Sequence, residues 1–313
     1  MMNKKIDWMK DLKWGIFTHY LYHEQNKAGS ATNMGKGCTD WNECVNEFDT
    51  EVLAEQVAST GASYLFFTVM QGTRFMCAPN KTFDDITGCK PGEACSERDL
   101  IADLIVSLKK RNIALFLYYT GDGPHFDEKC GPAMGFVEPR KNVSEQFIKN
   151  WAAVAEEYSL RYGKDVHGWW VDGCYTYFDY NDDKIGLYVP ALRAGNPDSL
   201  LSFNGGVENR VFKYSIHDDF TCGEMNMLYD IPDSRFIDGA QWFTLAPLGI
   251  PVGNSIWNSW CKPGCKYTSE YLNDYVTKVN AAGGVVTIDV GLYRDGHIDP
   301  AQIETLREMD ARF

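Results

Sequence analysis

Several features of membrane and nucleic-acid-binding proteins are missing from this chain of 313 residues. No apolar run approaches the roughly 20 residues that cross a bilayer, and the opening Met1–Lys5 leads into no apolar signal-peptide core. The sequence as it stands therefore predicts a cytoplasmic protein without a membrane partner. A secreted or periplasmic protein whose signal has been removed is the alternative. The net charge of −13 repels phosphate groups, so we predict no nucleic-acid partner.

Motifs of several enzyme classes are also missing. The chain has no Gly-x-Ser-x-Gly nucleophile elbow, no glycine-rich phosphate loop and no Cys-x-x-Cys pair, and only 6 histidines. We therefore predict neither a metal nor a cofactor in the catalytic site. Cysteine, by contrast, is plentiful at 10 residues, and free thiols, disulfides of a secreted enzyme and a metal site all stay open. The suggestive spacings are Cys38 with Cys44, Cys89 with Cys95, and Cys261 with Cys265.

What the chain does have is an alternation of short apolar runs and amphipathic segments. Eight strand signals alternating with helix signals predict an α/β fold, a (β/α)8 TIM-like barrel formed as a single domain by residues 1–313. A doubly wound open sheet is the runner-up. The expected strands are 14–20, 63–70, 113–120, 168–172, 200–203, 218–224, 241–248 and 285–290, and the expected helices are 50–60, 98–111, 143–162, 182–194, 269–282 and 300–312.

The segment Gly168–Gly173 is the most informative of these runs. An apolar strand ends abruptly in Asp172, and Gly173 lets the backbone turn sharply after it. In a parallel barrel that end of a strand carries the catalytic groups. Asp172 is therefore a candidate catalytic carboxylate, and the alternative is an acid that caps the next helix or turn.

The other predicted strand ends supply carboxylates, amides and aromatic rings, which is the set that glycoside hydrolysis uses. A metal-assisted reaction would need clustered acids and histidines, and only His217, Asp218 and Asp219 suggest one. The side chains at these ends are His19, Gln71, Tyr118, Tyr119, Asp122, Asp172, Asn204, Glu208, Glu224, Trp242 and Asp289.

Four segments in the same order resemble glycoside hydrolase family 29, the α-L-fucosidases. Trp8–Tyr20 is similar to the family's first strand, and Gly168–Gly173 to its "W-x-D-G" strand. The segment 98–119 resembles the family's second helix and third strand, and 282–307 resembles the last part of its barrel sequence. The resemblance implies a (β/α)8-like barrel and a retaining double displacement without a metal, and we expect the usual C-terminal β-sandwich to be absent.

The same resemblance assigns roles to individual residues. It makes Asp172 the nucleophile and, through the segment 218–224, Glu224 the acid/base, with Glu208 as the second candidate. It also implies that His19 contacts the sugar. We expect the pocket to include His19, Gln71, Arg74, Tyr119, Trp170, Asn204, Trp242 and Trp257.

Departures from the family pattern fall in the sugar-reading part of the pocket. The family's "H-H-D-G-F" is replaced by the run from Gln71 to Phe75, and Asp289 adds a negative charge to the segment 282–307. Arg74 suits an anionic group such as a carboxylate or sulfate, or serves as a structural ion-pair partner.

These observations predict a retaining exo-glycosidase, α-L-fucosidase-like, that acts on a terminal α-linked sugar of an oligosaccharide or glycoconjugate. Two other functions stay open. One is a carbohydrate-binding pseudoenzyme on the same barrel, and the other is a metal-dependent isomerase or lyase. The sequence makes no prediction of oligomeric state.

Overall fold

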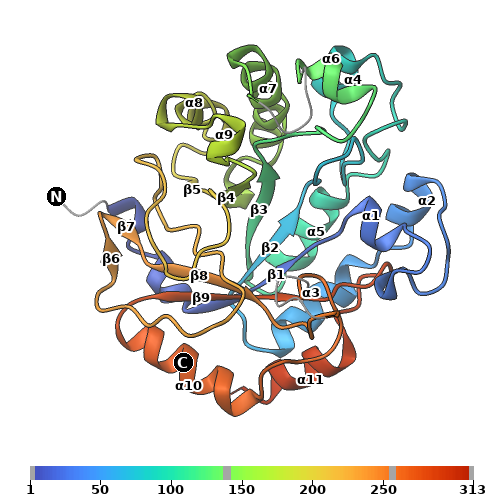
Figure 1. Ribbon diagram of the computed structural model, residues 1–313. Coiled ribbons are helices and arrows are strands. Elements are labelled where there is room, and N and C mark those ends of the chain that lie inside the picture. Colours follow the sequence, from blue (N-terminus) through green and yellow to red (C-terminus); the bar gives the residue numbers. More distant parts are fainter. Residues whose placement is uncertain (1–3, 137–141, 254–258, 310–313) are drawn as a thin grey trace.

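Seven parallel strands form one curled sheet at the centre of the protein (Figure 1). The computed structural model describes residues 4–136, 142–253 and 259–309. The strand order is β5-β4-β3-β2-β1-β9-β8. These strands are β1 (Trp14–Thr18), β2 (Tyr64–Thr68), β3 (Ala114–Thr120), β4 (Val166–Asp172), β5 (Leu200–Phe203), β8 (Phe243–Pro247) and β9 (Val285–Val290).

The sheet curls because aromatic side chains on its inner face pack on one another. Phe66 of β2 lies 5.8 Å from Phe243 of β8, ring centre to ring centre, although β1 and β9 separate the two strands. Phe17 contacts Trp170 of β4 in the same cluster, at 5.7 Å. Successive side chains of a strand alternate between faces, so the other half of each strand packs outward. The predicted α/β class is confirmed, and the curled parallel sheet is consistent with a TIM-like barrel, although it has seven strands in the described ranges where eight were predicted.

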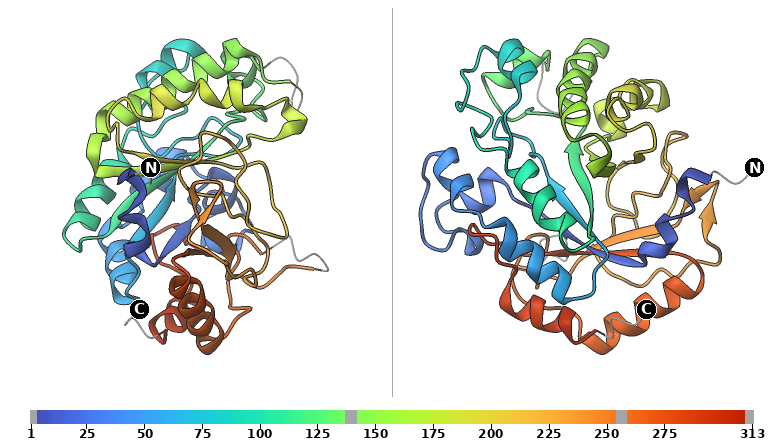
Figure 2. Two further views of the ribbon diagram at one scale, coloured as in Figure 1. Left: turned by 90° about the vertical axis from the view of Figure 1, so that its left-hand side faces the viewer. Right: turned by 180° about the vertical axis from the view of Figure 1, so that it is seen from behind.

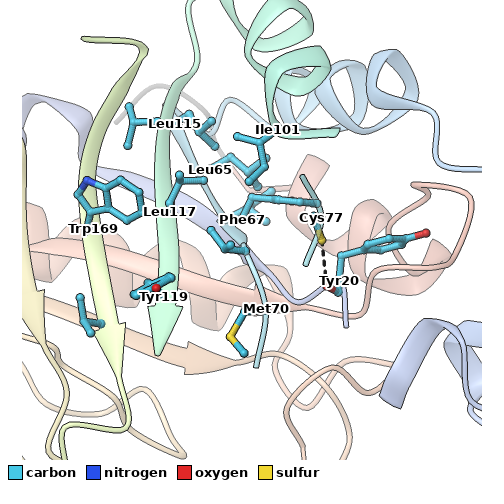
Figure 3. Close-up of a cluster of buried hydrophobic side chains, with 14 of the residues drawn as sticks. Tyr20, Leu65, Phe67, Met70, Cys77, Ile101, Leu115, Leu117, Tyr119 and Trp169 are labelled. Atoms are coloured by element: carbon cyan, nitrogen blue, oxygen red, sulfur yellow. Dashed lines mark hydrogen bonds between the residues drawn. The ribbon is translucent and has the colours of Figure 1, made fainter. Parts of the chain in front are cut away.

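In the part of the chain that the structure describes, five helices of eight or more residues cover the outer face. Their starts carry the expected caps: Asp49 and Ser144 accept hydrogen bonds from backbone amides of the first turn. Figure 3 shows the outer cluster, in which Leu65, Leu115 and Leu117 pack with Ile101 of α5. The five are α3 (Thr50–Ser59), α5 (Leu100–Lys109), α7 (Glu145–Tyr162), α10 (Ser269–Ala281) and α11 (Pro300–Arg307).

Short elements fill the connections between these helices and strands. α10 and α11 lie along one side of the sheet and α7, α8 and α9 along the opposite side (Figures 1 and 2). The predicted helix 182–194 is two short helices. The short elements are α1 (Tyr22–Gln25), α2 (Trp41–Asn46), α4 (Lys81–Thr87), α6 (Cys130–Met134), α8 (Asp182–Gly186), α9 (Val189–Leu192), the hairpin strands β6 (Phe236–Ile237) and β7 (Ala240–Gln241), and 3-10 turns at Lys4–Ile6, Met9–Leu12, Ala31–Asn33, Gly163–Asp165 and Thr176–Phe178.

The predicted sixth strand, 218–224, is not a regular strand. It makes two single bridges, Phe220 with Gln241 and Glu224 with Leu245, and runs between the edge strands β8 and β5. On the β5 side it makes one backbone bond, from the amide of Asp219 to Leu201, and its other contacts there are made by side chains. The carboxylates of Asp218 and Asp219 accept bonds from the amides of Phe203 and Leu201, at 2.8 and 2.9 Å. We name residues 218–225 the closing segment.

All ten cysteines are free thiols in the structure, so none of the three spaced pairs is a disulfide. Within the described ranges, no helix is both long and apolar enough to span a bilayer.

Candidate active site

Asp172 ends β4 at the carboxyl edge of the sheet, where the sequence placed it. Gly173 has φ +70°, and a Cβ there would lie 2.8 Å from the Asp122 carboxylate, so only glycine allows this turn. The Oδ2 atom of Asp172 accepts one hydrogen bond, from the Tyr118 hydroxyl at 2.7 Å. Its Oδ1 atom accepts three, from the Gly173 amide, the Tyr175 hydroxyl and the Asn204 side chain. These donors hold the carboxylate in one orientation.

Asn204 joins Asp172 to Glu224. It follows β5, and its side-chain nitrogen donates to Asp172 Oδ1 at 2.8 Å and to Glu224 Oε2 at 2.6 Å. The distance between Asp172 Oδ1 and Glu224 Oε2 therefore cannot exceed the sum of these two bond lengths. That limit agrees with the separation of about 5–5.5 Å between the carboxyl groups of retaining glycosidases.

Glu224 reaches this position from the closing segment. Gly223 before it has φ +58°, and a Cβ there would lie 2.1 Å from the Phe243 carbonyl, so this close approach to β8 requires glycine. Burial of the carboxyl group and the negative charge of Asp172 raise the pKa of Glu224 to about 8, against the lowering effect of the Asn204 hydrogen bond. Glu224 is therefore protonated at neutral pH, with Asp172 beside it.

His19 forms the other wall of the site. It follows β1, and its Nδ1 atom lies 2.7 Å from Oδ1 of Asp289 on β9. Burial disfavours the charged imidazole, but the neighbouring Cys261 and Asp289 outweigh it and raise the pKa of His19 well above its usual value. The second oxygen of Asp289 accepts a bond from the Cys261 amide at 3.1 Å.

These groups border a cavity of about 300 Å³ that contains both acids, His19, Trp170 and Trp260, and which we name the inner cavity. A second cavity of about 470 Å³ adjoins it, named here the outer cavity, and the two share Asp172, Gln71, His23 and Tyr175. The outer cavity is the more apolar of the two, and its lining includes the rings of Phe126, Tyr175, Tyr177 and Phe178. Asp172 therefore stands at the junction of a polar and a more apolar space.

Two further pocket predictions fall on these cavities. Gln71 lines both and donates to the Tyr118 hydroxyl at 2.7 Å. Trp170 is 2 % exposed, stacks on Tyr118 and belongs to the wall of the inner cavity.

Other predicted pocket residues lie elsewhere. Tyr119 is fully buried in the outer cluster of Figure 3. Its hydroxyl donates a hydrogen bond to the Trp151 carbonyl. Trp242 packs against Gly284 in the same outer layer. Arg74 is paired with Asp127 at 2.7 Å, which is the structural alternative. Trp257 lies outside the described residues.

Glu208, the second acid/base candidate, lies on an exposed loop, and among the five described cavities none contains it. The suggested cluster of His217, Asp218 and Asp219 does not form either. His217 contacts the Asp182 carbonyl, while the two aspartates accept the amides of β5. Within the described ranges, three potential metal ligands gather at one place only, which is His19, Cys261 and Asp289.

Tyr118 and Tyr175 are site residues outside the predicted pocket, although Tyr118 is among the predicted strand-end side chains. Tyr118 pairs in register with Trp170, two residues before Asp172, so it shares the inner face with both. Because successive side chains of a strand point to opposite faces, Tyr118 lies on the inner face of the sheet and Tyr119 on the outer face. Tyr175 had no comparable signal, because a loop after β4 carries it.

A curled parallel sheet with two carboxylates facing each other at its carboxyl edge, beside stacked aromatic rings, defines a glycoside hydrolase type of site. Comparison with protein families identifies the family of glycoside hydrolases. The chain belongs to the α-L-fucosidase family, whose model matches residues 41–311. It is thus a glycoside hydrolase. A comparison with curated proteins finds no significant match.

Solved structures share the fold over nearly the whole chain. The α-L-fucosidase of Bacteroides thetaiotaomicron has a TM-score of 0.64 and 14 % identity, over 99 % of this chain and 73 % of that one. Lactobacillus casei α-L-fucosidase AlfC, in complex with α-L-fucose, gives 0.65 and 19 %, over 97 % and 96 %. An endo-fucoidan hydrolase of family 107 gives 0.69 and 15 %, over 99 % and 93 %. At these identities the likeness concerns the fold.

Proposed function

We propose that the chain is a retaining exo-glycosidase in which Asp172 is the nucleophile and Glu224 the acid/base. The observation that carries this proposal is the Asn204 side chain, which holds one oxygen of each acid while their surroundings differ. Asp172 accepts four hydrogen bonds, whereas Glu224 accepts one and has a raised pKa. Glu224 thus holds a proton at neutral pH, as a general acid must.

In the first step, Asp172 attacks the anomeric carbon while Glu224 protonates the leaving oxygen. The attacking atom is Oδ2, because Oδ1 already accepts three bonds and Oδ2 only the one from Tyr118. The bond from the sugar to its leaving group breaks as the bond to Asp172 forms. In the second step Glu224, now ionised, takes a proton from a water molecule, whose oxygen bonds to the anomeric carbon as the bond from the sugar to Asp172 breaks.

A trapped covalent intermediate is known for an α-L-fucosidase of Bacteroides thetaiotaomicron, which supports this route by analogy. We propose a carbohydrate substrate with a terminal α-linked sugar, L-fucose or a related one, in the inner cavity. The next part of the substrate lies in the outer cavity against its aromatic rings. We also propose one domain, with the closing segment in the place of the remaining strand of a (β/α)8 barrel.

The pseudoenzyme alternative is not favoured, because a binding protein has no need of a second acid with a raised pKa. A screen of aryl α- and β-glycosides, including fucose, galactose and uronic acids, tests the proposal. We expect turnover of an α-L-fucoside or a related sugar, and a loss of at least 10³-fold in Asp172→Ala. Binding of sugars without turnover of any of them would overturn it.

The acid/base is tested separately. In Glu224→Ala, azide restores turnover of a substrate with a good leaving group, since the small anion replaces water and needs no base. Glu208→Ala serves as the matched control and keeps wild-type rates. Rescue of Glu208→Ala instead would move the role to Glu208.

A further inference from the structure

Three side chains of types that bind zinc meet beside the proposed catalytic acids. One ligand atom from each of His19, Cys261 and Asp289 lies within 4.8 Å of the other two, and all three residues are buried. They come from different parts of the chain: His19 follows β1, Asp289 is on β9, and Cys261 is on the loop before α10. The folded protein therefore assembles the cluster, which no short sequence motif predicts.

The geometry is close to that of a zinc centre. Zinc binds nitrogen and oxygen at about 2.0–2.2 Å and sulfur at about 2.3 Å in tetrahedral sites, so its ligand atoms stand roughly 3.5 Å apart. The Nδ1 atom of His19 and the Oδ1 atom of Asp289 are 2.7 Å apart, the length of a hydrogen bond, while the backbone amide of Cys261 holds the other oxygen of Asp289. An ion between the three therefore has to break the bond from His19 to Asp289 and move these two side chains apart.

Charge favours the same conclusion. A zinc ion with one thiolate, one carboxylate and one neutral imidazole forms a neutral unit, which low-dielectric surroundings tolerate better than a net charge. The two lysines of this loop are engaged elsewhere. Lys262 pairs with Glu24, and Lys266 donates to the Asn226 carbonyl.

We infer that His19, Cys261 and Asp289 form a zinc site with its fourth position open to the inner cavity. Both His19 and Cys261 line that cavity, so a water molecule or a substrate hydroxyl reaches the ion from there. On binding, the thiol of Cys261 and the imidazolium of His19 each give a proton to solvent, and the hydrogen bond between His19 and Asp289 is replaced by bonds to the metal. Zinc and sugar then compete for His19, a consequence that rests on the proposed function.

Metal binding is measured directly, with Zn²⁺ added to the full chain after treatment with a chelator. We expect one tight zinc per chain by mass spectrometry of the dialysed protein, and an affinity at least about tenfold weaker in Cys261→Ser. Cys265→Ser is the matched control: its thiol is on the same loop but contacts Thr305 instead. It keeps the wild-type affinity.

Cobalt gives a second readout. With Co²⁺, the wild type and Cys265→Ser show a sulfur-to-cobalt absorption band in the near ultraviolet, and Cys261→Ser does not. Equal zinc affinity in all three proteins, or a cobalt spectrum without the sulfur band, overturns the site. Melting curves establish that each variant folds, and Asp289→Asn provides a second ligand removal should Cys261→Ser not fold.

Kinetics test the competition. Zinc raises KM for an aryl fucoside in the wild type and in Cys265→Ser with little change in kcat, and it does so at least tenfold less effectively in Cys261→Ser, each compared with its own metal-free rate. A zinc-loaded wild type with unchanged KM overturns the competition. A chain that binds zinc through Cys261 but hydrolyses nothing with or without chelator refutes the hydrolase instead, and leaves the zinc site standing.

Discussion

Asn204 donates a hydrogen bond to each of the two proposed catalytic acids, Asp172 and Glu224, whose surroundings otherwise differ. One amide group touches both, yet Asp172 receives three further donors while Glu224 is left mainly with burial and the charge of its neighbour. Opposite environments of this kind separate the protonation states of a carboxyl pair. The asymmetry depends on individual hydrogen bonds, so it is tested by changing single side chains.

The pH dependence of turnover follows from Glu224. Since its pKa is raised to about 8, the proposed acid is protonated below that value and ionised above it. We expect kcat/KM to fall about tenfold per pH unit above pH 8. A pH–rate profile on a neutral aryl fucoside measures this, and a fall already complete at pH 6 would contradict it.

The stability of the fold depends on the same group. Because folding raises the pKa of Glu224, the folded state binds its proton more tightly than the unfolded chain does. The stability that Glu224 contributes is greatest below the ordinary pKa of a glutamate, about 4.3, and is lost as the pH rises toward 8. Urea unfolding at several pH values shows this slope, and Glu224→Gln reduces it.

Removing the shared amide has a predictable direction. The Asn204 bond lowers the pKa of Glu224, so Asn204→Ala raises this pKa further and moves the alkaline limb of the profile to higher pH. It also costs activity, about tenfold or more, since Asp172 loses a donor. Asn42→Ala on α2 is the control. An unmoved alkaline limb in Asn204→Ala would show that the two acids are not coupled through it.

At this scale the sequence predicted part of the site. Asp172, Asn204 and Glu224 each follow an apolar segment, and the structure brings the three together. Tyr119 and Trp242 were selected by position near a strand end, without regard to the face they occupy. Cys261 was noticed for its spacing to Cys265, whereas its partners are 242 and 28 positions away, a relation that only folding creates.

At the scale of elements, local signals predicted most of the fold. The helices have regular apolar spacing and side-chain caps, and the inner strands are apolar on both faces, so each is recognisable without knowledge of its neighbours. The closing segment is different. Its contacts with β5 are made mainly by the carboxylates of Asp218 and Asp219, a pattern that resembles a polar loop in sequence.

This closure gives a stability prediction. Asp218 accepts backbone bonds from Phe203, Tyr214 and Ser215, so Asp218→Ala leaves three amides without their acceptor. At about 1–3 kcal/mol for each buried unsatisfied group, we expect a loss of roughly 3 kcal/mol or more in the free energy of unfolding. Urea titration measures it. The exposed Asp233→Ala is the control, and equal stability of the two variants would refute this role.

At the scale of the whole molecule, net charge bears on the substrate. The structural relatives include a hydrolase of fucoidan as well as fucosidases. A chain with a net charge of −13 repels anionic polymers over long range, while a neutral sugar is indifferent to it.

Salt therefore discriminates between substrates. Raising the ionic strength from about 10 mM to about 300 mM shortens the screening length several-fold. We expect kcat/KM on a sulfated fucan fragment to rise several-fold, while the rate on a neutral aryl fucoside changes little. A fall with salt on the sulfated fragment would indicate a local cationic site that outweighs the overall charge.

The closing segment between β5 and β8 also bears on which part of the protein unfolds first. The proposed proton donor is on a stretch that backbone hydrogen bonds join to the β8 side but that mainly two aspartates join to β5, whereas its partner acid ends a strand with neighbours on both sides. On warming, we expect the contact with β5 to open first and to move the donor away from Asp172. Catalysis is then lost at a lower temperature than the helical signal in circular dichroism, and cooling after brief heating restores it.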